Sequence, residues 1–279
     1  MGRSRCPPDD DDTDYHPLSM ASRTYRAEAI VLKTTDLGEA DRILTLLTRH
    51  HGKVRVIAKG IRKPTSRLAG HAEPLVHATF QLARGRDLDV LTGAETRAAY
   101  RSLREDLPVI AAAWYISELA DRFSVERSAS APLFDLVETA LAALEAGAIA
   151  SVVCRWFDLH LLDRTGFRPE LGHCVQCRRS PDEVTNVWHP DAGGLVCARC
   201  AEAWTHGSLA LSVRALKSLR YLFVSDLPTA LLLKVDTLLA HELEHHLRGF
   251  LHHVLDRDIH ASRLLDEIAR LPKRLPAAV

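Results

Sequence analysis

The sequence lacks an apolar run of about 18 residues, the length that a membrane-spanning helix needs, so it predicts no membrane span and no membrane partner. It also lacks the apolar segment of a secretory signal peptide, because residues 1–20 are polar, acidic and proline-containing. Both absences predict a cytoplasmic protein with reduced cysteines. The chain also has no net charge, because 36 basic residues balance 36 acidic ones. Its overall electrostatic field therefore favours neither acidic nor basic partners.

Signatures of enzymes are also missing from the sequence. It contains no glycine-rich phosphate loop with a lysine, no nucleophile elbow and no dinucleotide-binding glycine pattern. We therefore predict that the protein is not an enzyme and has no catalytic residue. Aromatic residues are few near the N-terminus, where Tyr25, Phe80 and Tyr100 are the only ones among residues 21–100. Few rings indicate binding of a nucleic-acid backbone rather than recognition of its bases.

Four of the six cysteines form two C-x2-C pairs, Cys174 with Cys177 and Cys197 with Cys200. The 19 residues between the pairs fall in the range typical of zinc sites, and each pair can point two thiolates at one ion. Turn-forming residues at 189–194, flanked by apolar segments, predict a hairpin that brings the pairs together. Four thiolates close the coordination shell, which predicts a structural zinc ion (Zn). Two disulfides or four unrelated thiols are the alternatives.

The chain divides into three segments by composition and hydrophobic period. Residues 1–20 are expected to be a disordered acidic tail. Residues 21–100 carry five short apolar segments separated by glycines, which predicts an N-terminal five-stranded OB-fold barrel that binds DNA. Residues 101–279 change to apolar spacings of three and four, which predicts a mainly α-helical domain with a four-cysteine zinc module inserted at about 171–205. The expected fold class is therefore α+β, with strands at 27–32, 42–48, 53–59, 75–82 and 88–92, and helices within 107–166, 212–223 and 228–258.

Positive charge is concentrated in the predicted barrel, where residues 21–100 carry 14 basic and 8 acidic side chains. Residues 49–67 contain seven basic residues and no acidic one. In the third expected strand, Lys53 and Arg55 alternate with apolar residues, which predicts one buried and one cationic face. OB-type barrels bind nucleic acids on their second and third strands and neighbouring loops, so we expect contacts to DNA phosphates there. The candidate DNA-binding residues are Arg42, Arg49, Lys53, Arg55, Lys59, Arg62, Lys63, Arg67, Arg84 and Arg86.

Three alternatives to DNA binding remain open on the sequence. Residues 241–245 read H-E-x-x-H, the motif of zinc proteases, which makes a zinc hydrolase one alternative. At about 100° per residue, His241 and His245 lie roughly opposite the apolar stripe of their helix and are expected to face solvent, which disfavours it. A solvated charged surface is the second alternative. A scaffold that binds acidic protein tails through its basic barrel is the third.

Several sequence blocks together resemble the RecO family, the bacterial DNA repair and recombination mediators, over about residues 24–270. The blocks in the predicted barrel are 29–34, 38–43, 51–54, 58–64 and 66–68. The blocks in the remainder are 158–162, 166–171, 174–177, 191–197, 245–247 and 262–265. The histidine-rich ending of the last helix is typical of the family, which gives the H-E-x-x-H residues an explanation other than catalysis.

The resemblance implies an N-terminal OB-fold and a helical C-terminal domain that carries a zinc-binding module. It also implies binding of single- and double-stranded DNA without sequence preference, and annealing of complementary strands. The implied partners are RecR and single-strand binding protein, with RecA loaded indirectly, and the implied location is the cytoplasm at the nucleoid. The acidic extension of residues 1–20 is not a feature of the family, so the resemblance implies nothing about it.

Overall fold

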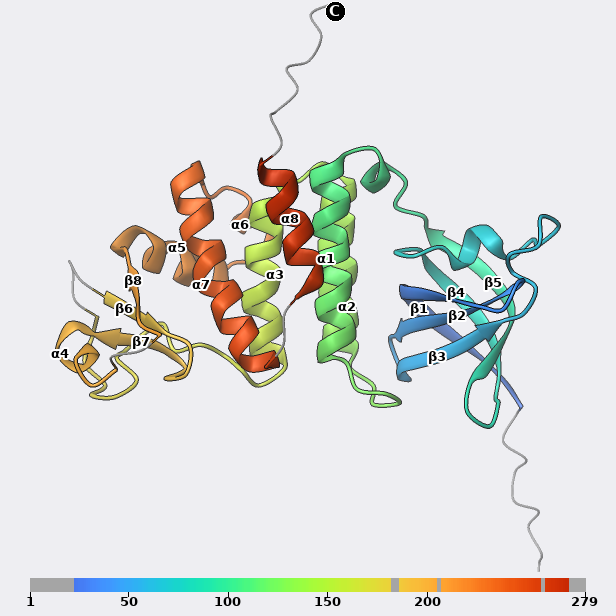
Figure 1. The fold of residues 1–279 in the computed structure, drawn as a ribbon, viewed down its shortest axis with the longest axis horizontal. Coiled ribbons are helices and arrows are strands. Elements are labelled where there is room, and N and C mark those ends of the chain that lie inside the picture. Colours follow the sequence, from blue (N-terminus) through green and yellow to red (C-terminus); the bar gives the residue numbers. More distant parts are fainter. Residues whose placement is uncertain (1–22, 182–185, 205–206, 257–258, 271–279) are drawn as a thin grey trace, which may run out of the picture.

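The computed structural model describes residues 23–181, 186–204, 207–256 and 259–270. A barrel of strands contacts a bundle of helices, and a small β-module lies at the end of the bundle away from the barrel (Figure 1). The expected acidic tail lies outside the described residues. Among the described residues, no helix combines the length and the apolar character required to cross a membrane.

The N-terminal part is a closed barrel of five strands. The strands are β1 (Thr24–Leu37), β2 (Asp41–Thr48), β3 (Gly52–Ala58), β4 (His77–Ala83) and β5 (Asp89–Ala98), with a 3-10 turn η1 (Ala69–Ala72) between β3 and β4. Their order around the barrel is β1-β2-β3-β5-β4, and neighbours are antiparallel except β3 and β5, which are parallel. The five-stranded OB barrel is therefore confirmed, although β1 and β5 are longer than expected.

The barrel interior is filled by the inward residues of alternating strands. Leu44 and Leu46 of β2 face Val56 and Val54 of β3, and each of the four is at most 1% exposed. Phe80 of β4 is fully buried among them. Because successive side chains of a strand point to opposite faces, the intervening residues of β2 and β3 point outward. The outward face is therefore available for contacts to other groups.

The helical part is built around one central helix, α3. The elements are η2 (Ser102–Arg104), α1 (Leu107–Phe123), α2 (Ala131–Glu145), α3 (Ala150–Arg164), α5 (Val213–Val224), α6 (Leu227–Ala230), α7 (Thr237–Leu255) and α8 (His260–Arg270). Helix α3 contacts α1, α2, α5, α6 and α7. Ten of its 15 residues are buried, including the ion pair of Arg155 and Asp158. The Tyr115 hydroxyl donates a hydrogen bond to Asp158 (2.9 Å) and joins α1 to α3.

The expectation of one continuous helix over 228–258 is wrong. The chain forms α6 and α7 instead, and each begins at an aspartate cap. Asp226 accepts a hydrogen bond from the Thr229 N–H (3.0 Å), and Asp236 accepts one from the Leu239 N–H (2.9 Å). Such a carboxylate satisfies an N–H group that has no partner within a new helix, so Asp236 starts a second helix rather than continuing the first.

The β-module contains the expected hairpin, formed by β6 (Asn186–His189) and β7 (Gly194–Cys197). A short helix, α4 (Ala198–Ala201), follows, and β8 (Leu209–Leu211) adds a third strand that the sequence analysis did not anticipate. Trp188 of β6 is fully buried, with its ring 5.5 Å from that of Phe250 and 6.1 Å from that of His246 in α7. This indole anchors the module to the helical bundle.

The barrel is docked onto the helices by apolar and polar contacts. Leu32 of β1 and Leu47 of β2 belong to the same apolar cluster as the helices rather than to the barrel interior. The Ser117 hydroxyl of α1 donates a hydrogen bond to the Leu32 carbonyl (2.8 Å). Gly52 has φ +68°, and a Cβ there would lie 2.3 Å from the Ser128 carbonyl oxygen. Glycine is therefore required where the α1–α2 connection passes over the barrel.

Candidate nucleic-acid interface and metal centre

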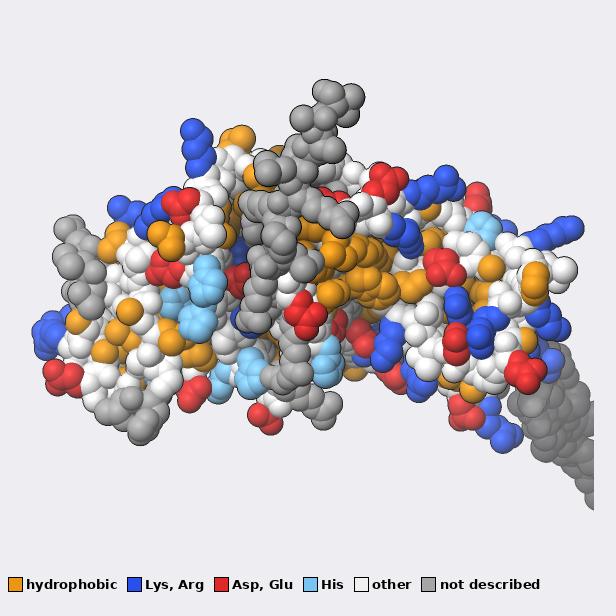
Figure 2. Space-filling model, turned by 45° about the horizontal axis from the view of Figure 1, so that its top comes forward, with side chains coloured by type: hydrophobic (Ala, Val, Ile, Leu, Met, Phe, Trp, Pro, Cys, Tyr) orange, Lys and Arg blue, Asp and Glu red, His pale blue; other side chains and the backbone are white. Residues whose placement is uncertain are grey.

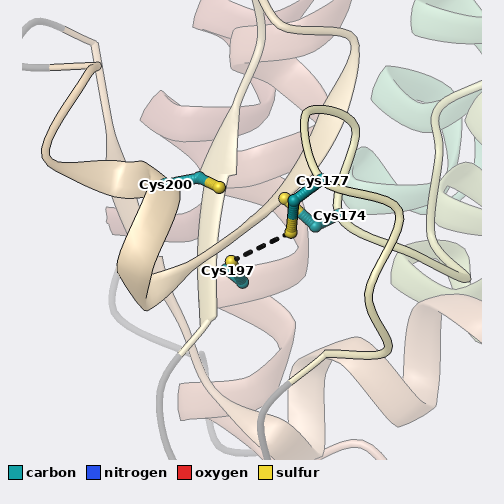
Figure 3. A group of neighbouring side chains, drawn as sticks. All are labelled: Cys174, Cys177, Cys197 and Cys200. Carbon is teal, nitrogen blue, oxygen red and sulfur yellow. Dashed lines mark hydrogen bonds between the residues drawn. The ribbon is translucent and has the colours of Figure 1, made fainter.

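The four paired cysteines converge on one point of the β-module (Figure 3). Cys174 and Cys177 come from the turn before β6, Cys197 ends β7, and Cys200 lies in α4. Their sulfur atoms all lie within 4.8 Å of one another. None forms a disulfide, since the sulfurs of Cys177 and Cys197 are 3.7 Å apart, compared with about 2.05 Å in a disulfide bond. The structure thus brings together the four predicted metal ligands.

The spacing of these sulfur atoms fits a metal ion at their centre. A Zn–S distance of about 2.3 Å places the corners of a tetrahedron about 3.8 Å apart, close to the 3.7 Å between Cys177 and Cys197. Burial raises the pKa of Cys174, but backbone N–H groups of Cys177 and Cys197 outweigh it and lower the pKa to about 6. Hydrogen bonding with Cys197, then burial, raise the pKa of Cys200 to about 12. A cation bound among these sulfur atoms favours the deprotonated form of all four cysteines, so the cluster can hold a metal ion.

Backbone contacts explain why the cysteines meet. The Arg178 N–H donates a hydrogen bond to the Cys174 carbonyl (2.9 Å) and closes the first turn. The Leu195 N–H of β7 donates to the Glu170 carbonyl (2.9 Å), which brings the hairpin against the chain before that turn. Gly194 has φ +145°, and a Cβ there would lie 2.4 Å from the Glu170 carbonyl oxygen. Only glycine permits this close approach, so Gly194 holds the two cysteine pairs in register.

The H-E-x-x-H residues of α7 do not assemble a second metal centre within the described residues. The Glu242 carboxylate accepts hydrogen bonds from the Ser212 N–H (2.7 Å) and hydroxyl (2.8 Å), so it stabilises the start of α5. His241 and His245 are exposed, as the helical periodicity predicts, with ring centroids 6.4 Å apart. A zinc hydrolase therefore gains no support from this geometry.

Two candidate DNA-binding residues of the barrel are engaged by carboxylates. The Arg42 guanidinium lies 2.9 Å from a carboxylate oxygen of Asp36 and 3.1 Å from one of Glu73, at an inward position near the start of β2. The Lys53 ammonium donates to the Asp121 carbonyl (2.6 Å) and lies 3.1 Å from its carboxylate, at the end of α1. Arg42 is therefore ion-paired within the barrel part of the chain, and Lys53 joins the barrel to α1.

Arg49, a third candidate, contacts three carboxylates at the junction between the barrel and α2. Its guanidinium lies 3.2 Å from Glu28 in β1, 2.7 Å from Asp135 and 3.1 Å from Glu138, both in α2. The same guanidinium lies over the Phe134 ring, 4.8 Å from its centroid. Arg49 thus holds the barrel against α2.

The other candidates project from the barrel surface, where Lys and Arg side chains are interspersed with acidic ones (Figure 2). Arg62 contacts the Gly38 carbonyl (3.1 Å) and lies 3.5 Å from Asp36. Arg84 lies over the Tyr25 ring, 5.1 Å from its centroid. Six candidates are exposed and, within the described ranges, have no acidic side chain at ion-pair distance: Arg55, Lys59, Lys63, Arg67, Arg84 and Arg86.

The outward face of β1, β2 and β3 carries a cation that the sequence analysis missed. Lys33 of β1 pairs with Thr45 of β2, which pairs with Arg55 of β3, so the three side chains form one row across the sheet. Lys33 and Arg55 are both exposed. A register shift between Val31 and Lys33 interrupts the alternation of β1, so the period of the sequence does not identify the outward position.

The β4–β5 loop, which carries Arg84 and Arg86, is held by a buried carboxylate. Asp89 is 1% exposed; it accepts a hydrogen bond from the Tyr25 hydroxyl and lies 3.1 Å from Arg127. Burial raises the pKa of Asp89, but hydrogen bonds from Arg127 and Tyr25 lower it overall. Burial and the hydrogen bond to Asp89 raise the pKa of Tyr25 to about 12. This contact fixes the base of the loop beside β3, with its two arginines exposed.

Two family models match consecutive parts of the chain. Recombination protein O N terminal matches residues 20–100, and Recombination protein O C terminal matches residues 104–263. A DNA repair protein RecO from Roseiflexus sp. is 39% identical over 252 residues, which cover 90% of this chain and 88% of that protein. Others from Dehalococcoides mccartyi (36% over 246 residues, 88% and 96% covered) and Pelotomaculum thermopropionicum (33% over 256 residues, 92% and 99% covered) are similar along nearly their whole length. The chain therefore belongs to the RecO family of DNA repair proteins.

Proposed function

We propose that the protein is a mediator of homologous recombination that binds single- and double-stranded DNA without sequence preference and anneals complementary strands. With RecR, it helps load RecA onto strands coated by single-strand binding protein, in the cytoplasm at the nucleoid. Membership of the RecO family supports a role in DNA repair. RecR, single-strand binding protein and RecA are the partners that the resemblance to the RecO family implies.

The observation that carries the proposal is the division of the barrel's cations into two classes. Four candidates already have carboxylate partners within the protein: Arg42, Arg49, Lys53 and Arg62. Among the six exposed cations without such partners, Arg55 of β3 and the two arginines of the β4–β5 loop lie where barrels of this type bind nucleic acids. The other three, Lys59, Lys63 and Arg67, lie on the connection that continues from β3. An unpaired surface cation can neutralise a phosphate without first breaking an internal ion pair, so the second class forms the proposed DNA surface.

Annealing follows from this charge distribution. Two DNA strands repel each other, and a cationic surface that neutralises their phosphates lowers this repulsion. Contacts to the backbone leave the base edges free to pair with the complementary strand. The proposed role requires neither nucleotide hydrolysis nor a catalytic residue.

We further propose that the metal is zinc, held by Cys174, Cys177, Cys197 and Cys200. Four cysteine ligands leave no open coordination position, so a bound zinc ion contributes stability to the β-module rather than chemistry. The module adjoins α7 through Trp188, away from the barrel in Figure 1. Removal of the metal is therefore expected to affect folding of the module before it affects the barrel surface.

The test is the salt dependence of DNA affinity when Lys59, Lys63 and Arg67, three of the unpaired cations, are together replaced by glutamate. The slope of log affinity against log salt is expected to fall by about 2, because each lost phosphate contact removes about 0.7–0.9. A control variant replaces two cations of the helical part, the exposed Lys217 and Lys234, by glutamate and is expected to keep the slope. An unchanged slope in the triple variant would show that these cations do not contact DNA.

A competition experiment separates DNA binding from the alternative scaffold function. An acidic peptide that displaces DNA from the native protein, and loses affinity in the triple variant, would show that acidic tails and DNA share the barrel surface. A peptide that binds equally well to the native protein and the triple variant would place acidic tails elsewhere on the molecule. DNA binding by the barrel predicts loss of DNA affinity in the triple variant in both cases.

A further inference from the structure

A cleft of about 730 Å³ lies between the barrel and the helices, beside the proposed DNA surface. Leu32 and Lys33 of β1 form one wall, and one face of α1, between Trp114 and Arg122, forms another. His260 at the start of α8 also lines the cleft. Apolar side chains are exposed in the hollow between the helical part and the barrel (Figure 2). The cleft thus combines an aromatic wall with a lysine at its edge.

Trp114 is the large aromatic side chain of this cleft. Its neighbours Ala113 and Tyr115 are buried in the apolar core of the helices. Trp114 is partly exposed and, among the described residues, is not part of that core. Across the described residues, no aromatic ring or cationic side chain is stacked on its indole. A partly exposed indole without a stacking partner offers a flat surface on which another ring can stack.

The acidic side chains of the cleft are already neutralised by the protein. Glu118 accepts hydrogen bonds from the His260 N–H (2.9 Å) and the Ala261 N–H (2.6 Å), and it pairs with Arg122 (2.6 Å). Asp121, the other carboxylate of the cleft, is held by the Lys53 ammonium of β3, as described above. Lys33 has no such partner within the described ranges, so the cleft does not repel a polyanion.

The cleft is continuous with the outward face of the barrel through Lys33. This lysine lines the cleft and also begins the row that continues through Thr45 to Arg55. A strand whose phosphates follow Arg55 and Lys33 reaches the cleft at the end of this row. Adjacent nucleotides of a single strand are unpaired, and one base can turn toward the indole while its phosphate stays at Lys33.

We propose that this cleft is a subsite for one unpaired base of single-stranded DNA, with Trp114 as its stacking surface and Lys33 as the phosphate contact. The proposal rests on the proposed binding of DNA by the barrel and adds a preference for single strands to it. Duplex DNA cannot use the subsite without extruding a base, so double-stranded binding depends on the barrel cations alone. Stacking is possible for every base, so the subsite adds no sequence preference.

The direct test is tryptophan fluorescence of the full chain titrated with oligo-dT. Trp156 and Trp188 are 5% and 0% exposed, and the ring of the partly exposed Trp204 lies 4.6 Å from that of His189 in the β-module. Trp114 is therefore the indole whose face is open to a base. Fluorescence is expected to be quenched as oligo-dT binds. Replacing Trp114 by Phe is expected to abolish the quenching while binding persists, and the control Trp204→Phe is expected to keep it.

Affinity measurements provide a second readout. Trp114→Ala is expected to weaken binding of single-stranded DNA about tenfold, as loss of one stacked base predicts, and to leave duplex affinity unchanged. Trp114→Phe is expected to keep most of the affinity because a ring remains. The salt slope is expected to stay the same in both variants, since stacking releases no counterions. This constancy distinguishes Trp114 from the barrel cations.

The outcomes separate the subsite from DNA binding itself. Native protein that binds both kinds of DNA without quenching, and whose single-strand affinity is unchanged in Trp114→Ala, would overturn the subsite alone. Equal loss of single-strand and duplex affinity in Trp114→Ala would also overturn it, because it would indicate a structural role. Native protein that binds no DNA would overturn the proposed function, and the subsite with it.

Discussion

Replacing Arg49 by methionine tests whether the cations of the barrel divide into structural and DNA-binding classes. The substitution keeps much of the aliphatic length but removes contacts to Glu28, Asp135 and Glu138 at distances of 2.7–3.2 Å. Arg49 is 27% exposed, which places it between the surface ion pairs that contribute about 0–1 kcal/mol and the buried pairs whose disruption costs about 3–5 kcal/mol. We expect the free energy of unfolding to fall by about 2 kcal/mol.

Calorimetry and DNA binding together check this expectation. For a chain of this size, about 2 kcal/mol corresponds to a Tm lower by about 4–8 °C. The salt slope of DNA affinity is expected to stay at the native value, because Arg49 has carboxylate rather than phosphate partners. Arg97→Met is the matched control: Arg97 also lies near Glu28, at 3.4 Å, but is 53% exposed, so its loss should lower stability by less than about 1 kcal/mol. The reasoning is refuted if Arg49→Met leaves the Tm unchanged and lowers the salt slope by about 1.

Further predictions concern the β-module and α7. Cys174→Ala is expected to abolish stoichiometric zinc measured by atomic absorption and to lower the Tm, and native protein purified without metal but equally stable would contradict this. Burial lowers the pKa of His246 to about 4, below the value of about 6.5 in an unfolded chain, so the native state binds fewer protons between these values. The free energy of unfolding is expected to fall by up to about 3 kcal/mol as pH drops from about 6.5 to about 4, and His246→Leu should flatten this dependence in denaturant titrations. Glu242→Gln is expected to lower stability by about 1 kcal/mol through its contact to Ser212 and to leave DNA affinity unchanged, whereas loss of a peptidase activity on this change would revive the hydrolase alternative.

The local features of the fold could be predicted from the sequence. The strands of the barrel show alternation and glycine turns, and the two cysteine pairs flank a hairpin within 27 residues, from Cys174 to Cys200. Both patterns are formed by residues close to one another in the sequence, so they can be recognised without the tertiary fold. The break at Asp236 was missed because the apolar residues on either side suggest one helix, and the cap is a single side chain.

The division of the cations could not be predicted, because their partners are distant in the sequence. Arg49 and Lys53 belong to the same acid-free run as Lys59, and nothing local distinguishes them. Their partners Glu138 and Asp121 lie 89 and 68 positions further along the chain and reach them only when the barrel docks on the helices. The composition of a segment therefore identified a cationic surface but could not show which of its charges are neutralised.

Lys33 and Trp114 were missed for a related reason. The expected first strand ended at residue 32, since the apolar run stops there and the register shift hides the outward position of Lys33. Trp114 fits the apolar periodicity of α1 and therefore resembles a core residue in the sequence. Only the placement of α1 against β1 shows that the indole faces a cleft rather than the core.

The most direct test of the proposed function is the annealing of complementary oligonucleotides, each coated with single-strand binding protein, without ATP. Native protein is expected to accelerate annealing, with an effect that declines as salt increases, and the triple variant at Lys59, Lys63 and Arg67 is expected to lose most of it. The control variant at Lys217 and Lys234 should anneal as the native protein does. A folded, zinc-bound protein that does not accelerate annealing, or a triple variant as active as the native protein, would contradict annealing by the cationic surface of the barrel.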